Sequence, residues 1–122
     1  MSPEQIVRDF CAAVRRTDLA EIVGFFAPDA LYHNIPLEPV RGTAEIESTL
    51  RQFLTPGGEV EFEIKALAVT GQTVLTERVD RFEIGGKRVE LPVMGAFEVD
   101  RDGRITAWRD YFDMQQFTKQ LT

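Results

Sequence analysis

The segment at 59–87, EVEFEIKALAVTGQTVLTERVDRFEIGGK, has the pattern of antiparallel strands joined by tight turns. Apolar side chains at positions 60, 62 and 64 alternate with charged side chains at 59, 61, 63 and 65, and this period of two is typical of a half-buried strand. Gly71-Gln72 interrupts the pattern, and Gly85-Gly86 is a strong hairpin signal. We therefore expect long antiparallel strands in the second half of the chain.

The residues before this segment have helical spacing. Ser2, Pro3 and Gln5 are suited to the N-cap, first position and capping-box partner of a helix over 3–16, where apolar residues recur every four positions. A second short helix is expected over 18–26. It should stop before the proline at 28, because proline disfavours helical geometry in the residue preceding it.

A third helix is expected after Thr43, which is a suitable cap, and should end at Gly57-Gly58. A short early strand is expected over 31–35, a last strand after the turn at Asp102-Gly103, and a C-terminal helix capped by Asp113. Helices segregated from a run of strands indicate an α+β fold. We expect a cone-shaped fold, in which N-terminal helices pack in a strongly curved mixed, mostly antiparallel β-sheet that forms a pocket.

Composition and charge exclude several classes of protein. The 122 residues, 43% hydrophobic and 28% charged, predict one globular domain over 1–122. A net charge of -6 argues against binding nucleic acid. Without an apolar run of membrane-spanning length or a leader pattern, we expect no membrane partner and a cytoplasmic location. One cysteine, Cys11, and one histidine, His33, supply neither a disulfide nor the usual zinc ligand sets, although carboxylates leave another metal open.

Two charged residues lie on the face of the strand at 73–84 that the sequence pattern predicts to be buried. Its even positions are the more apolar at both ends, so alternation turns Arg78 and Asp80 inward beside Phe82. Charges are rarely buried unless they are paired. This inward pair therefore needs an explanation.

Two other strands place polar groups on their inward faces. In the last strand, Asp110 lies between the aromatic residues Trp108 and Phe112 on one face. In the early strand, Tyr32 and Asn34 share a face. A hydroxyl, an amide and a second carboxylate can thus converge on the inward pair.

The structural alternative is that Arg78 merely neutralises two buried carboxylates, since isolated internal ion pairs are often structural. Five polar groups on inward faces shift the balance towards a functional site. Burial raises the pKa of an aspartate and a guanidinium lowers it, so Asp80 and Asp110 can take unequal protonation states. Such asymmetry suits a general acid and a general base.

Apolar side chains near these groups line a substrate pocket or belong to the core, and inward position does not separate the two. We favour pocket wall for Phe82 and Phe112, which flank the two carboxylates. His33 is set on the opposite face from Tyr32 and Asn34, so a structural or solvent role is expected. The predicted pocket residues are Phe82, Phe112, Trp108, Leu91 and Val93.

Three motifs carry a resemblance that covers most of the chain: Tyr32-His33-Asn34-Ile35-Pro36-Leu37, Thr76-Glu77-Arg78-Val79-Asp80 and Trp108-Arg109-Asp110-Tyr111-Phe112-Asp113. With these the chain resembles the limonene-1,2-epoxide hydrolases. That family lies within the broader group of nuclear-transport-factor-2-like and polyketide-cyclase-like (SnoaL-like) folds. The resemblance implies a homodimer and one-step hydrolysis of an epoxide to a vicinal diol, with no metal or organic cofactor.

The resemblance also implies a role for each polar residue. Asp110 is the general base on a water that Tyr32 and Asn34 also bind, Asp80 in its protonated form donates to the epoxide oxygen, and Arg78 bridges the two carboxylates. The expected partners are water and a small lipophilic epoxide, cyclic or alkyl. Two alternatives remain open: an isomerase or cyclase of the same fold acting on a carbonyl substrate, and a non-catalytic ligand-binding or dimerisation module.

Overall fold

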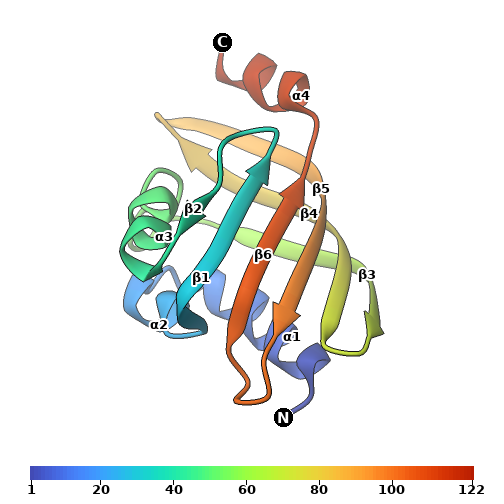
Figure 1. Cartoon of the computed structure of the whole chain (residues 1–122). Coiled ribbons are helices and arrows are strands. Elements are labelled where there is room, and N and C mark those ends of the chain that lie inside the picture. The colour runs from blue at the N-terminus through green and yellow to red at the C-terminus, as the bar shows by residue number, and fades with distance from the viewer.

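The computed structural model describes residues 1–122 (Figure 1). Three helices and two strands come first, followed by four further strands and a short helical C-terminus. In chain order the elements are α1 (Pro3–Val14), α2 (Leu19–Val23), β1 (Phe26–Ile35), β2 (Val40–Arg41), α3 (Thr43–Leu50), β3 (Glu61–Thr70), β4 (Thr73–Ile84), β5 (Lys87–Val99), β6 (Ile105–Tyr111), α4 (Met114–Thr118) and the 3-10 helix η1 (Lys119–Leu121).

The six strands form one sheet in the order β2-β1-β6-β5-β4-β3. Neighbouring strands are antiparallel except for β1 and β6, which are parallel. The sheet curves strongly, and α1 packs across β3, β4 and β5 (Figure 1). The predicted α+β fold with a curved, mostly antiparallel sheet is confirmed.

Helix α1 begins as the sequence predicts. The Ser2 side chain accepts a hydrogen bond from the backbone N–H of Gln5 at 3.1 Å, and Pro3 occupies the first turn. The Gln5 side chain donates to Asp9 at 2.8 Å, so the second half of the capping box is not made. Residues at helical spacing, Val7, Phe10 and Val14 among them, face the sheet and are fully buried.

The largest difference from the sequence prediction concerns β1. The strand begins at Phe26, five residues before the predicted start, and the helix expected over 18–26 is shortened to Leu19–Val23. Phe26 pairs with Ile105 of β6, and the carbonyl of Phe25 accepts a hydrogen bond from Ile105 at 2.8 Å. This pairing between distant segments outweighs the local preference for helix.

Helix α3 also departs from the prediction at both ends. Its N-cap is Gly42, at a φ of 91° and without a side-chain hydrogen bond, and Thr43 is already helical. The helix ends at Leu50 and is followed by a turn over residues 51–53, while Phe53 and Leu54 still pack on the core. The apolar spacing therefore extends beyond the regular helix.

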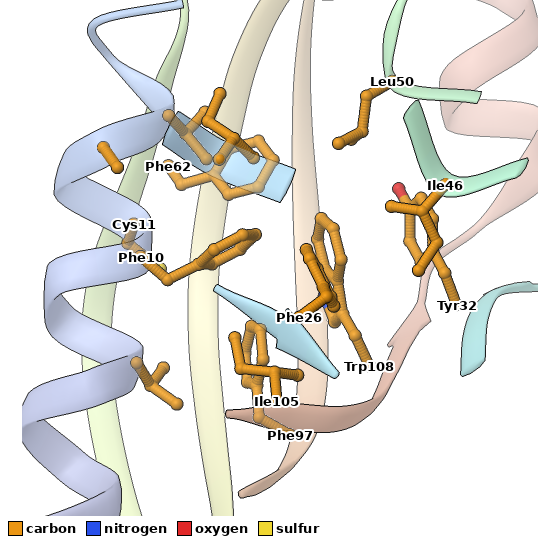
Figure 2. Packing of buried hydrophobic residues seen from close by; sticks show 14 of the residues in the cluster. Phe10, Cys11, Phe26, Tyr32, Ile46, Leu50, Phe62, Phe97, Ile105 and Trp108 are labelled. Atoms are coloured by element: carbon orange, nitrogen blue, oxygen red, sulfur yellow. The ribbon is translucent and has the colours of Figure 1, made fainter. Parts of the chain in front are cut away.

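Aromatic rings fill the space between α1 and the sheet (Figure 2). Phe10 points from α1 towards Trp108, with ring centroids 5.0 Å apart and planes at 77°. Phe26 and Phe97 stack on the same indole. No helix of this fold combines the length and apolar character needed to cross a membrane.

Candidate active site

A cavity of about 190 Å³ opens between the concave face of the sheet, α3 with the turn after it, and the C-terminal helix. Ten of its fifteen lining residues are hydrophobic, so an apolar molecule finds a favourable environment here. The acidic and hydrogen-bonding side chains of the lining come mainly from the sheet. They are Tyr32, Asn34, Asp80 and Asp110, with Thr49 and Gln52 on the α3 side.

Strand register brings the four sheet residues together. Asn34 lies directly opposite Asp110 in the parallel pair of β1 and β6, and Tyr32 lies opposite Trp108 in the same pair. Asp80 reaches the cavity from β4, which is separated from β6 by the whole of β5. Residues from three separate segments thus meet at one wall.

Arg78 joins the carboxylates of Asp80 and Asp110 across β5. Its Nε and Nη2 donate to the two oxygens of Asp80 at 3.0 and 2.8 Å, and its Nη1 and Nη2 donate to those of Asp110 at 3.1 and 2.7 Å. Nη1 also donates to the Thr76 hydroxyl at 3.1 Å. Every N–H of the guanidinium therefore has an acceptor, as a fully buried cation requires.

Gly95 makes this bridge possible. It lies on β5 directly between Thr76 of β4 and Asp110 of β6. A Cβ at this position would meet Oδ1 of Asp110 at 2.6 Å and the guanidinium of Arg78 at a shorter distance still. Only a residue without a side chain leaves room for the guanidinium to pass over β5.

The environment of the cluster perturbs its protonation. Burial, outweighing the nearby charge of Arg78, raises the pKa of Asp80 from 3.8 to about 6. Burial also raises the pKa of the Tyr32 phenol, with the charge of Asp110 acting in the same direction. Although burial opposes its charge, the two carboxylates keep the pKa of Arg78 well above the ordinary value. The cluster is a permanent cation between two carboxyl groups, one of which can carry a proton near neutral pH.

The predicted pocket residues divide into two groups. Phe82, Phe112, Leu91 and Val93 line the cavity. Trp108 does not, and its placement in the pocket wall is wrong: the side chain is 0% exposed and lies behind Tyr32, whose ring stacks on it at 4.1 Å. The indole Nε1 instead donates to Oδ1 of Asp110 at 2.7 Å.

Other predicted positions lie outside the cavity. The Arg78 side chain, 0% exposed, lies behind the two carboxylates. His33 bonds through Nε2 to the carbonyl of Leu37 at 2.7 Å. Cys11 is buried in the core, where burial raises its pKa to about 12. Neither His33 nor Cys11 is placed to act on a ligand in the cavity.

Several residues of the site escaped the sequence analysis. Thr76 had a signal, because it shares the inward face of β4 with Arg78 and Asp80. Gly95 had one too, since an isolated glycine within a strand marks a close backbone approach. Phe62 and Ile84 had a signal as well, because each lies on the apolar face of its strand. The remaining wall residues had none, because their positions depend on how the loop after β1, α3 with its following turn, and α4 dock. These are Leu37, Thr49, Gln52, Phe53 and Phe117.

The model of the limonene-1,2-epoxide hydrolase catalytic domain matches residues 1–122. The chain belongs to this family. The reaction class that the motifs predicted, epoxide hydrolysis, is thereby confirmed, and the isomerase or cyclase alternative is not favoured. The family is that of an enzyme, which also argues against a non-catalytic module.

Individual relatives agree with the family assignment. Epoxide hydrolase EphG of Mycobacterium tuberculosis (strain ATCC 25618 / H37Rv) is 39% identical over 117 residues, which span 94% of this chain and 76% of EphG. A solved LEH-like epoxide hydrolase from M. tuberculosis superposes with a TM-score of 0.82 at 37% identity, covering 96% of this chain and 86% of its own. This family enzyme shares the whole fold described above.

A more distant solved structure is similar to this chain in fold alone. It is described as a SnoaL-like polyketide cyclase from Shewanella denitrificans, has a TM-score of 0.84 and 19% identity, and covers 98% of this chain and 96% of its own. The carboxylates of Asp80 and Asp110 both accept hydrogen bonds from Arg78. No group of three or more His, Cys, Asp or Glu side chains is placed to bind a metal ion.

Proposed function

We propose that this epoxide hydrolase adds water to a small lipophilic epoxide in one step and releases a vicinal diol. The observation that carries the proposal is the arrangement of Asp80 and Asp110 on either side of Arg78, at the wall of an otherwise apolar cavity. Epoxide opening needs an acid on the leaving oxygen while a base acts on the attacking water. Asp80, whose pKa burial raises to about 6, can hold the proton of the acid, and Asp110 can act as the base.

Each residue then has one task. Asp110, as a carboxylate, takes a proton from a water that also hydrogen-bonds to Tyr32 and Asn34. The water oxygen attacks one epoxide carbon, the bond from that carbon to the epoxide oxygen breaks, and the proton of Asp80 passes to this oxygen. Arg78 does not line the cavity, so we assign it a positioning role. The Tyr32 phenol, whose raised pKa keeps it neutral, can donate and accept hydrogen bonds with the water.

Cavity size and lining support the proposed substrate class. A cavity of about 150 Å³ suffices to bind benzene, so about 190 Å³ admits a compact ring or short alkyl chain that carries the epoxide. Phe82, Leu91 and Phe112 surround the space in front of the carboxylates. Apolar area removed from water provides the binding free energy, since few polar groups are offered to the remainder of the substrate.

The test is hydrolysis of terpene, cycloalkene and styrene-type epoxides by chelator-treated protein, with diols followed by chiral chromatography. We expect turnover that survives chelation and is lost in Asp110→Asn. Absence of diol from folded protein across the panel would contradict the proposal and direct attention to carbonyl substrates.

A single-turnover reaction in ¹⁸O-labelled water tests the one-step pathway. Direct attack by water places the label in the diol during the first turnover. Attack by an aspartate oxygen would instead deliver unlabelled oxygen from the carboxylate in that turnover, and such a result would overturn the assignment of Asp110 as a base.

The expected homodimer stays a prediction of the family resemblance. Sedimentation equilibrium tests it, and a mass of about 13.8 kDa across the concentration range would contradict it.

A further inference from the structure

Arg78 makes equivalent hydrogen bonds to the two carboxylates of the cluster. Both receive two hydrogen bonds from it, at 2.8 and 3.0 Å for Asp80 and at 2.7 and 3.1 Å for Asp110. Both side chains are 6% exposed. The guanidinium alone therefore does not decide which carboxyl group holds the proton.

The two carboxylates differ in one contact. Oδ1 of Asp110 also accepts a hydrogen bond from Nε1 of Trp108 at 2.7 Å. Asp80 accepts hydrogen bonds from Arg78 alone. A donor aimed at a carboxylate stabilises the ionised form over the protonated form, and such charge-assisted bonds are stronger than neutral ones.

The core fixes the direction of this donor. The indole is stacked between Tyr32, at 4.1 Å and 8°, and Phe97, at 5.7 Å and 14°, while Phe10 meets it edge-on at 5.0 Å. Figure 2 shows this ring surrounded by side chains from α1, β1 and β5. Because the ring is fully buried and held on both faces, its N–H cannot turn away from Asp110.

We infer that Trp108 is a positioning residue that assigns the two roles, holding Asp110 as the base and leaving the proton on Asp80. The inference deepens the proposed hydrolysis and rests on it. Trp108 acts through Asp110, because the indole does not reach the cavity.

The same contact acts between turnovers. When the diol forms, Asp110 has gained a proton from water and Asp80 has lost one to the epoxide oxygen, so the pair is reversed. Before the next substrate reacts, Asp110 must lose a proton and Asp80 must regain one. A donor that favours ionised Asp110 drives both changes towards the productive state.

The indole N–H signal tests the contact without substrate. Trp108 is the only tryptophan, so ¹⁵N-labelled protein gives a single indole signal. At pH 7 we expect the indole proton of the parent protein to resonate downfield of the indole proton of Asp110→Asn, where a neutral amide replaces the carboxylate. Equal positions in the two proteins would overturn the inference. Circular dichroism establishes that both proteins are folded.

Replacement of the indole nitrogen tests the consequence for catalysis. Growth on β-(3-benzothienyl)alanine substitutes a sulfur atom for the N–H at position 108 alone, with nearly the same ring shape. Growth on 5-fluorotryptophan is the matched control, because it alters the ring but keeps the donor. Any loss in the fluorinated protein measures the steric cost, and the difference between the two proteins measures the hydrogen bond.

Relative to the fluorinated protein, the sulfur analogue should lose about tenfold or more in kcat. The apparent pKa of the acid limb of its pH–rate profile should rise by about one unit, with little change in KM. Equal kcat and equal acid limbs would overturn the inference, and a rise in KM alone would do the same. An inactive parent would contradict the proposed function instead, and the indole signal would then decide the inference by itself.

Discussion

Arg78 and Arg81 lie three residues apart on β4, on opposite faces of the sheet, and each is surrounded by carboxylates. Arg78 bonds to Asp80 and Asp110 on the concave face with its side chain 0% exposed. Arg81 bonds to Glu61, Glu63 and Glu90 on the convex face at 3.2, 2.9 and 2.8 Å, with its side chain 31% exposed. The ionic groups of the two clusters are similar, but their exposure to solvent differs.

Solvent exposure reverses the effect on the carboxyl groups. On the convex face, the hydrogen bond from Arg81 lowers the pKa of Glu63. On the concave face, burial outweighs the guanidinium and raises the pKa of Asp80 to about 6. Glu63 is therefore ionised throughout the neutral range, whereas Asp80 can carry a proton there. Only the inner cluster has the means for acid catalysis.

Replacing each arginine in turn should give the largest difference between the two clusters, measured as a loss of stability. Arg78→Met leaves two carboxyl groups buried without their cation, and we expect the free energy of unfolding to fall by about 3–5 kcal/mol. Arg81→Met should cause a much smaller decrease, because water solvates the exposed glutamates. Urea denaturation measures both. Equal losses in the two variants would mean that the inner cluster is no more buried than the outer one.

Neutralising one acid from each cluster tests the division of function. Asp80→Asn removes the proposed proton donor with little change in shape, and kcat should fall by about 10²- to 10⁴-fold. Glu63→Gln, the convex-face counterpart, should keep the activity of the parent. Steady-state kinetics on one epoxide suffice. Comparable activity in the two variants would remove Asp80 from the mechanism.

The pH dependence should also distinguish the two faces. Protonated Asp80 is the active form, so kcat/KM should fall about tenfold per pH unit above about pH 6. Stability has the same sign for this group: its folded pKa lies above 3.8, so its contribution is present below pH 3.8 and lost as pH rises through about 6. Glu63 contributes in the opposite sense, losing its stabilisation as pH falls below 4.5. An activity that rises from pH 6 to pH 8 would contradict this assignment.

Alanine substitutions at neighbouring positions of β5, one on each face, give the smallest of these contrasts. Gly95→Ala sets a Cβ against Asp110 and Arg78, so the bridge must shift and kcat should fall by about tenfold. Met94→Ala changes the preceding residue of β5, which faces solvent on the convex side, and should leave kcat unchanged. If Gly95→Ala has full activity, the close approach over β5 is not needed for catalysis.

The sequence predicted the polar wall because alternation is local. A period of two in β4 and β6 is enough to turn Arg78, Asp80 and Asp110 inward, whatever the strands pair with. Alternation in the early strand likewise places Tyr32 and Asn34 on one face. The motifs then added the family, and with it the reaction class.

What the sequence did not predict depends on contacts between distant segments. The place of Trp108 behind Tyr32 follows from the parallel pairing of β1 with β6. The early start of β1 depends on Phe26 pairing with Ile105. Phe117 reaches the cavity because the C-terminal helix docks at its mouth. Periodicity within one element carries none of this information.

The most direct measurement is a ¹³C NMR titration of labelled aspartate carboxyl groups, with Asp80→Asn used to assign the signal. Our account predicts that the buried carboxyl group of Asp80 takes up its proton near pH 6. If Asp80 remains ionised down to about pH 4, the inner cluster is a structural ion pair like its counterpart on the convex face, and the proposed acid catalysis is wrong.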